Sequence, residues 1–182
     1  MPEGLIITQC APTLAGMKTG SLFNCEYQNR NELLEQIASL NRCLGKKGLR
    51  MMVLGYPRKN RALIYLFRIR QLKRDLRREG ICEILQERGY EPHQMGQCLS
   101  RLIERLKEEN EFPHEIGCFL GYPSEDIRGF IDHVQPYKYV GTWQVYGDLN
   151  EALKQFELFR RCTESYIRQF EKGTTIERLA VA

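Results

Sequence analysis

The stretch LRMMVLGYPRKNRALIYLF, residues 49–67, decides the fold class of this chain. It contains two apolar runs of strand length, Leu49–Leu54 and Ala62–Phe67, with turn residues between them. Two such runs joined by a short polar segment are typical of a β-hairpin. We therefore predict a hairpin with a six-residue, basic tip at Gly55–Asn60.

The segment before the hairpin predicts one helix and one short strand. Asn29 is a helix N-cap with Glu32 three residues later, and apolar residues then recur at helical spacing until Gly45. Ser21–Cys25 is a candidate strand. Residues 1–20 contain scattered prolines and glycines without a clear period, so we expect an ordered loop there.

The segment after the hairpin is divided by prolines and glycines into several short helices. The run YKYVGTWQVY, residues 137–146, alternates like a strand with one face formed by Tyr137, Tyr139, Trp143 and Val145. Asp148 caps a long final helix, and residues 174–182 form a short turn. We predict a single α+β domain, residues 1–182, in which a small mixed or antiparallel sheet of about three to four strands packs with about six helices.

Composition excludes several classes of protein. Hydrophobic residues make up 42% and charged residues 27% of the chain, which is ordinary for a globular domain. No apolar run approaches the ~20 residues of a membrane-spanning helix, and the N-terminus does not resemble a signal peptide. The seven cysteines are scattered without a C-x-x-C pair, so we expect free thiols in a cytoplasmic protein and no metal site. The net charge of +4 permits an anionic partner.

Cys10, Thr13 and Lys18 bring a thiol, a hydroxyl and an amine into one short segment. Cys10 is a candidate catalytic nucleophile whose pKa Lys18 would lower, and Lys18 is a candidate anion ligand. The simpler interpretation is a buried thiol that holds the N-terminal segment to the core.

His114 and Glu115 form a candidate acid/base pair within FPHEIGCFLGY, residues 112–122. His133 or Asp126 would be further partners. The zinc-protease pattern H-E-x-x-H is not met, because Cys118 stands where the second histidine is needed. The simpler interpretation is a hydrogen-bonded histidine beside a glutamate that the helix dipole favours.

The strongest electrostatic signal is the segment Arg58–Arg78, which has nine basic residues and one acid, Asp75. Such a segment could bind nucleic-acid phosphates or an anionic cofactor. A solvated helix face is the simpler interpretation.

Trp143, the only tryptophan, raises a different possibility, an aromatic pocket for a flat ligand such as flavin or a tetrapyrrole (haem). Core packing explains such a tryptophan more often.

Five blocks of the sequence carry a family resemblance: CAPTLAG with the following Lys18 and SLF, NRALIY, FPHEIG-x-FLGYP-x-ED-x-x-GFI, G-x-W-x-VYGD, and ERLAVA. Through these blocks, from about Cys10 to Ala182, the chain resembles the bacterial family called domain of unknown function 3793. The positions that match are Cys10, Thr13, Gly16, Lys18, Arg61, His114, Glu115, Gly117, Gly121, Tyr122, Trp143 and Tyr146. The resemblance implies a cytoplasmic protein of anaerobic Gram-positive bacteria, encoded near flavodoxin or iron-transport genes, and it brings no established activity.

The leading hypothesis is a cytoplasmic binding or accessory module for an anionic or flat cofactor, such as flavin or haem, or for a redox partner. The partner would be a flavodoxin-like or iron-metabolism protein. The ligand-binding candidates are Thr13, Lys18, Arg61, Tyr122 and Trp143. One alternative is an enzyme that uses Cys10 or His114/Glu115, and another is nucleic-acid binding through Arg58–Arg78.

Overall fold

The computed structural model describes residues 1–108, 112–133 and 135–182. These residues form two compact units, unit 1 (Met1–Arg70 with Phe159–Ala182) and unit 2 (Gln71–Leu158). The predicted α+β class is confirmed, since nine α-helices and two small antiparallel sheets occur over the described ranges. The prediction of one domain over residues 1–182 stays a prediction, and each unit is described by itself.

Unit 1 is built on a three-stranded antiparallel sheet with the order β1-β3-β2. Its strands are β1 (Gly20–Glu26), β2 (Leu49–Arg58) and β3 (Arg61–Arg68). The register pairs Phe23 with Ile64 and Met51 with Leu66. Directly paired residues share a face of the sheet. That face therefore supplies the strand contribution to the core of unit 1.

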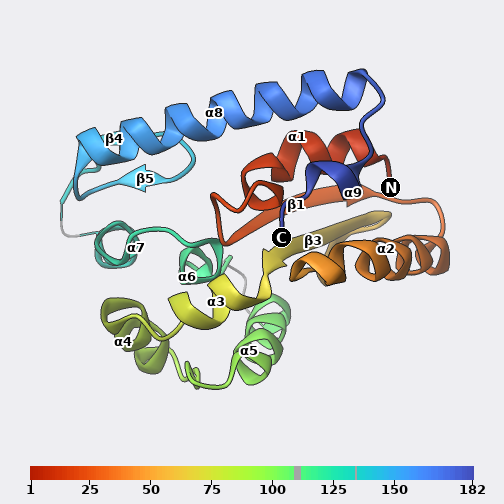
Figure 1. Cartoon of the computed structure of the whole chain (residues 1–182). Helices are drawn as coiled ribbons and strands as arrows, with labels where there is room; N and C mark the ends of the chain where they lie inside the picture. Colours follow the sequence, from red (N-terminus) through yellow and green to blue (C-terminus); the bar gives the residue numbers. More distant parts are fainter. Residues whose placement is uncertain (109–111, 134) are drawn as a thin grey trace. The chain divides into compact units, whose positions relative to one another are not determined.

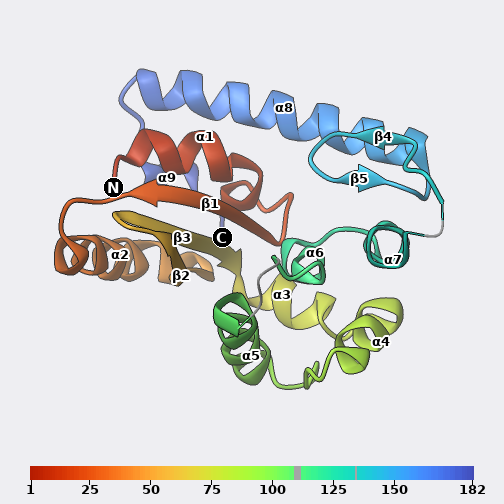
Figure 2. The same ribbon diagram turned by 180° about the vertical axis from the view of Figure 1, so that it is seen from behind.

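Helices complete the core of unit 1. They are α1 (Glu3–Leu14), α2 (Arg30–Leu44), the 3-10 turn η1 (Gly45–Lys47), α9 (Ile176–Leu179) and the last part of α8 (Leu149–Glu171). Helix α1 runs beside β1 in both views (Figure 1, Figure 2). The predicted N-cap of α2 is confirmed, because the Asn29 side chain accepts hydrogen bonds from the backbone N–H groups of Asn31 and Glu32.

The loop predicted for residues 1–20 is wrong, because α1 occupies most of this segment. Pro12 lies inside the last turn of the helix, where its missing N–H removes one backbone hydrogen bond. Burial offsets this cost, since Ile6, Ile7, Cys10 and Leu14 are at most 1% exposed. The helix is apolar on more than one side, so its sequence has little amphipathic period. The turn predicted for residues 174–182 contains the single helical turn α9.

The six-residue hairpin tip is also corrected. Strands β2 and β3 continue toward each other until only Lys59 and Asn60 lie between them. The pairing of β2 with β3 shifts register after Val53 and again after Gly55, so β2 contains extra residues that have no direct partner on β3. Asn60 takes a φ of 60°, a left-handed conformation that asparagine tolerates.

Unit 2 is mainly helical. It contains α4 (Glu79–Glu87), α5 (Met95–Glu108), α6 (Ile116–Leu120) and α7 (Ser124–Asp132). Helix α3 (Ile69–Asp75) and helix α8 have residues in both units. Helices α6 and α7 approach closely at Gly117, where an added Cβ would lie 2.8 Å from Cγ1 of Ile127. Gly121 then ends α6 with a φ of 77°, which glycine adopts without strain.

The single strand predicted at residues 137–146 is a tight hairpin instead. Strands β4 (Tyr139–Val140) and β5 (Gln144–Val145) pair with each other and form a separate sheet. The chain reverses at Gly141, where the Phe156 ring occupies the place that a Cβ would need. The strand alternation therefore does not hold across Gly141, and Tyr137 and Tyr139 are exposed.

The final long helix begins as predicted, since an Asp148 carboxylate oxygen accepts a hydrogen bond from the Glu151 backbone N–H at 3.0 Å. Across the described ranges, every helix is too short or too polar to cross a lipid bilayer.

Candidate ligand-binding site

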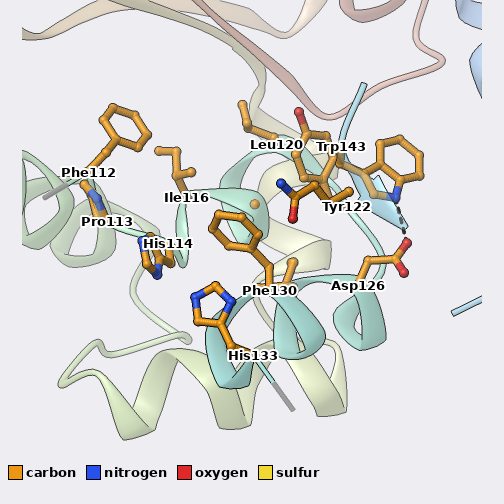
Figure 3. A pocket seen from close by; sticks show the side chains of 13 residues that line it. Phe112, Pro113, His114, Ile116, Leu120, Tyr122, Asp126, Phe130, His133 and Trp143 are labelled. Carbon is orange, nitrogen blue, oxygen red and sulfur yellow. Dashed lines mark hydrogen bonds between the residues drawn. The ribbon is translucent and has the colours of Figure 1, made fainter. Parts of the chain in front are cut away.

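Unit 2 contains a cavity of about 680 Å³ that is lined mostly by aromatic and aliphatic side chains (Figure 3). Its walls come from the segment before α6, from α6 and α7, and from the β4–β5 hairpin. The lining residues are Phe112, Pro113, His114, Ile116, Gly117, Leu120, Tyr122, Asp126, Ile127, Phe130, His133, Trp143 and Gln144. We call this the aromatic cavity.

Three rings form one wall of the aromatic cavity, the imidazole wall. The ring centroids of His114 and Phe130 are 4.9 Å apart, those of Phe130 and His133 are 5.7 Å apart, and those of His114 and His133 are 6.2 Å apart. Such edge-to-face arrangements are favourable for aromatic rings. Phe130 lies in the last turn of α7, and His133 follows as its left-handed C-cap residue with a φ of 49°.

Two further rings form the indole wall. Tyr122 and Trp143 lie 4.9 Å apart between centroids, and Phe156 packs edge-on against Trp143 at 4.5 Å. The Tyr122 hydroxyl donates to the carbonyl of Thr142 at 3.1 Å. Burial raises the pKa of Tyr122 to about 12, so this phenol stays protonated and neutral at ordinary pH.

Asp126 holds the indole wall in place. Its Oδ2 accepts a 2.6 Å hydrogen bond from the Trp143 indole N–H, and Figure 3 shows this contact. Its Oδ1 accepts from the backbone N–H groups of Tyr146 and Gly147, each at 2.7 Å. The carboxylate is only 4% exposed and already has three donors, so its role is to fix the hairpin on α7.

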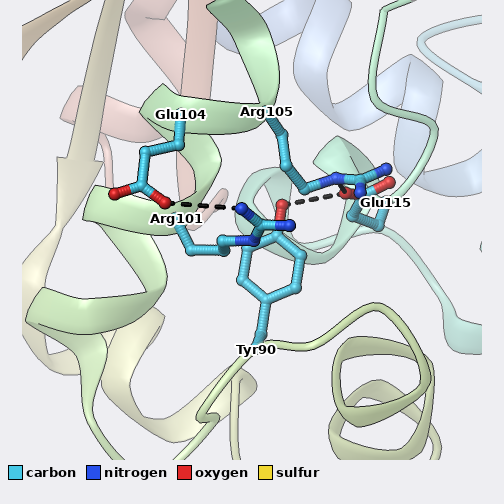
Figure 4. A network of polar contacts seen from close by, with 5 residues as sticks. All are labelled: Tyr90, Arg101, Glu104, Arg105 and Glu115. Atoms are coloured by element: carbon cyan, nitrogen blue, oxygen red, sulfur yellow. Dashed lines mark hydrogen bonds and ion pairs between the residues drawn. The ribbon is translucent and has the colours of Figure 1, made fainter. Parts of the chain in front are cut away.

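Glu115 is not among the residues that line the aromatic cavity. It belongs to a separate buried network (Figure 4). Its Oε1 lies 2.5 Å from Nε of Arg105 and accepts a 2.8 Å hydrogen bond from the Tyr90 hydroxyl. Burial, together with the adjacent Glu115 charge, raises the pKa of Tyr90. His114 and Glu115 are therefore sequence neighbours with different surroundings, and they do not converge as an acid/base pair.

Cys10, Thr13 and Lys18 lie in unit 1 and come together in a buried polar cluster. The Thr13 and Ser21 hydroxyl oxygens are 2.8 Å apart. Burial raises the pKa of Cys10 to about 12, although the nearby Lys18 charge and the Ser21 hydroxyl act in the opposite direction. Burial also lowers the pKa of Lys18 to about 8. A buried, protonated thiol is a poor nucleophile, so this geometry favours a core role for Cys10.

The basic segment Arg58–Arg78 is not one solvated face. Arg68 is 7% exposed and donates to three backbone carbonyls, those of Thr13 at 2.7 Å, Leu14 at 2.6 Å and Val181 at 3.0 Å. Arg61 lies at the hairpin tip. The segment is also divided at Arg70 between the two units.

The aromatic cavity therefore brings together the predicted site residues His114, Tyr122 and Trp143, and it also contains His133 and Asp126, the two further partners considered for His114. Cys10, Thr13, Lys18, Arg61 and Glu115 do not line it. Sequence reasoning did not identify Phe130 as a site residue. Its spacing of four residues from Asp126 on α7 was an available signal, because residues i and i+4 share a helix face. No group of three or more histidine, cysteine or acidic residues suited to a metal ion occurs among the described residues.

Comparison with known proteins identifies the family and nothing further. The family described as protein of unknown function (DUF3793) matches residues 6–180, and the chain therefore belongs to this family. No curated protein and no solved structure shows a significant match to the chain.

Proposed function

We propose that this member of the DUF3793 family is a binding protein that holds a flat, largely apolar ligand in the aromatic cavity. The observation that carries the proposal is the cavity itself, about 680 Å³ in volume, with aromatic rings on two of its walls. Ligand pockets of roughly 300–1,000 Å³ lined by apolar and aromatic side chains are typical of small-molecule sites.

The chemistry of the lining favours a planar ring system with a few polar edge atoms. The ring faces of Phe130 and Trp143 offer stacking surfaces, and the side chains of His114, His133 and Gln144 offer hydrogen bonds. Among the described lining residues there is no lysine or arginine, so the buried part of the ligand is expected to be uncharged. The isoalloxazine ring of a flavin and the porphyrin of haem both meet these requirements, and imidazole is a usual ligand of haem iron.

The single tryptophan makes this proposal directly testable, because Trp143 lies in the cavity wall. The purified chain would be titrated separately with riboflavin and haemin, while tryptophan fluorescence and the absorption spectrum of each probe are followed. We expect one of the two to quench Trp143 with saturation and to shift its own spectrum. A fatty acid serves as an apolar but non-planar control probe and is expected to bind more weakly.

Matched variants separate the cavity from non-specific binding. Phe130→Ala and His114→Ala are expected to weaken binding about tenfold, because each removes a ring from the imidazole wall. His93→Ala is the control, since His93 is an exposed histidine of the same unit that does not line the cavity. An unchanged spectrum and unchanged fluorescence with both probes would refute the proposal, as would an equal loss in His93→Ala.

The cellular setting is part of the same proposal. A cytoplasmic, bacterial protein with a flavin or haem bound in the aromatic cavity would act beside a flavodoxin-like or iron-metabolism protein. The family resemblance supports this partner, and the ring-lined cavity supports the cofactor type. Native mass measurements of the chain mixed with a flavodoxin test the partnership, and two unassociated masses would count against it.

A further inference from the structure

Unit 1 has a second cavity, of about 570 Å³, at the tip of the β2–β3 hairpin. It lies where β1 ends and where the Lys59–Asn60 turn joins β2 to β3. The lining residues are Glu26, Tyr27, Gln28, Arg58, Lys59, Asn60 and Arg61. We call this the basic cavity. It belongs to a different unit from the aromatic cavity and shares no residue with it.

Strand register places two arginines directly against each other in the basic cavity. Arg61 on β3 pairs with Arg58 on β2 and, on its other side, with Glu26 on β1. Directly paired residues of antiparallel strands point to the same face, and like charges in such a pair repel each other. An anion bound between the two guanidinium groups would relieve that repulsion.

Arg61 also has an unused donor. Its Nε is buried and, across the part of the chain that the structure describes, has no hydrogen-bond partner. A buried donor without an acceptor is costly to the folded state, and native structures rarely leave one unexplained. A ligand oxygen in the cavity would supply the acceptor.

The charge of the lining matches a phosphoryl group. Three cationic side chains and one carboxylate, that of Glu26, give the basic cavity a net charge of about +2. A phosphate monoester carries about −1.5 to −2 at neutral pH. Guanidinium groups bind phosphate oxygens in a bidentate geometry that a single ammonium cannot provide.

We propose that the basic cavity is a binding site for the phosphoryl group of a small phosphorylated ligand, with Arg61 as its central contact. Arg58 and Lys59 neutralise the remaining charge from the exposed rim. Tyr27, also in the lining, offers a ring surface to the rest of the ligand. The site does not depend on a ligand in the aromatic cavity.

Calorimetric titration with inorganic phosphate and with pyrophosphate tests the proposal. The unmodified chain is expected to bind both, and pyrophosphate more tightly because it carries more charge. Arg61→Gln is expected to weaken pyrophosphate binding about tenfold, and Lys59→Ala a few-fold. Arg50→Ala is the matched control, because Arg50 is an exposed arginine of the same sheet outside the cavity, and its binding should be unchanged.

Glu26→Gln provides a test that misfolding cannot imitate. Removing the only carboxylate of the lining is expected to strengthen pyrophosphate binding several-fold. Absence of binding by the unmodified chain, an equal loss in Arg50→Ala, or no gain in Glu26→Gln would each overturn the inference. Binding of a single-stranded oligonucleotide without binding of pyrophosphate would also overturn it and would favour a nucleic-acid surface instead. None of these outcomes bears on the Trp143 titration.

Discussion

The aromatic cavity of unit 2 and the basic cavity of unit 1 are similar in volume, about 680 and 570 Å³, but their linings have opposite chemistry. The first is lined by rings and aliphatic side chains, and the second by two arginines, a lysine and one glutamate. Volume alone therefore does not identify the ligand of a cavity. The side chains in the wall decide whether a planar apolar ring or a phosphate is the favoured occupant.

The two cavities also differ in what supports them. The segment that enters α6 is held from within by the buried Glu115–Arg105 pair, and the indole wall is held by Asp126. In the basic cavity, backbone pairing between β2 and β3 fixes the positions of the lining residues Arg58 and Arg61. The cationic side chains of Arg58 and Lys59 are exposed. Substitutions that remove buried support should therefore damage the aromatic cavity more than surface substitutions of the same kind.

The largest expected effect is that of Glu115→Ala. The Arg105 side chain is 14% exposed and Glu115 is fully buried, so the variant leaves a buried guanidinium without this carboxylate. Removing one partner of a buried ion pair typically costs about 3–5 kcal/mol. Urea denaturation measures the free energy of unfolding. Glu164→Ala, in the exposed ion pair of Arg160 and Glu164, is the control and should cost less than about 1 kcal/mol. Equal losses in the two variants would contradict the assigned role of Glu115.

The second prediction concerns Cys10, which lines neither cavity. If Cys10 were a reactive nucleophile, a catalytic site would lie outside both cavities. Burial raises the pKa of Cys10 from 9.0 to about 12. At about pH 8 the thiolate fraction of Cys10 should therefore be about a thousandfold below that of an ordinary thiol. The folded chain should resist iodoacetamide at Cys10, and its slow labelling rate should still rise with pH, without a plateau, at about pH 9. Mass spectrometry of labelled peptides measures this, with the half-buried Cys43 as the internal control. Faster labelling of Cys10 than of Cys43 would revive the nucleophile hypothesis.

The third prediction tests how tightly the indole wall is packed. In Gly141→Ala the new Cβ would overlap the Phe156 ring, which packs on Trp143. Such overpacking typically costs about 1–3 kcal/mol. The tryptophan emission spectrum should shift as the ring moves. Gly96→Ala is the control, because nothing lies within 4 Å of its added Cβ and it lies in α5. An unshifted emission in Gly141→Ala would mean that Phe156 does not fix the indole wall.

The smallest expected effect comes from ionic strength. Raising salt from about 0.1 M to about 1 M shortens the Debye length from about 10 Å to about 3 Å. Pyrophosphate binding at the exposed cations of the basic cavity should weaken several-fold. Binding of an uncharged flavin in the aromatic cavity should stay nearly constant, because it rests on apolar burial. Equal salt dependence of the two titrations would remove the distinction between the cavities.

Sequence reasoning succeeded where local chemistry decides the structure. Asn29 and Asp148 cap helices through short side chains that act on the nearest backbone N–H groups, so their roles are visible in the sequence. It failed for α1, where Pro12 argues locally against a helix and only burial in the core overrides it. It failed again at Gly141, where the close approach of the Phe156 ring, a residue 15 positions later, leaves no room for a side chain.

In the aromatic cavity, too, the residue types could be predicted from the sequence, but their arrangement in space could not. Trp143 was predicted to line a pocket for a flat ligand, Tyr122 was a ligand-binding candidate and His114 an acid/base candidate, and the fold places all three around one cavity. Their relation to Phe130 and Asp126 depends on how α6, α7 and the β4–β5 hairpin pack. The position of Glu115 against Arg105 depends on how α5 packs against the segment before α6. No local pattern in the sequence specifies such packing.

Arg68 donates hydrogen bonds to the carbonyls of Thr13, Leu14 and Val181, and these three bonds cannot all form at the same stage of synthesis. Unit 1 is discontinuous, because its first part ends at Arg70 and its second part begins at Phe159. On the ribosome, Gln71–Leu158 is complete before the closing segment of unit 1 has emerged. The hydrogen bond from Arg68 to Val181 can therefore form only after all of Gln71–Leu158 has been synthesised, so unit 1 is completed last.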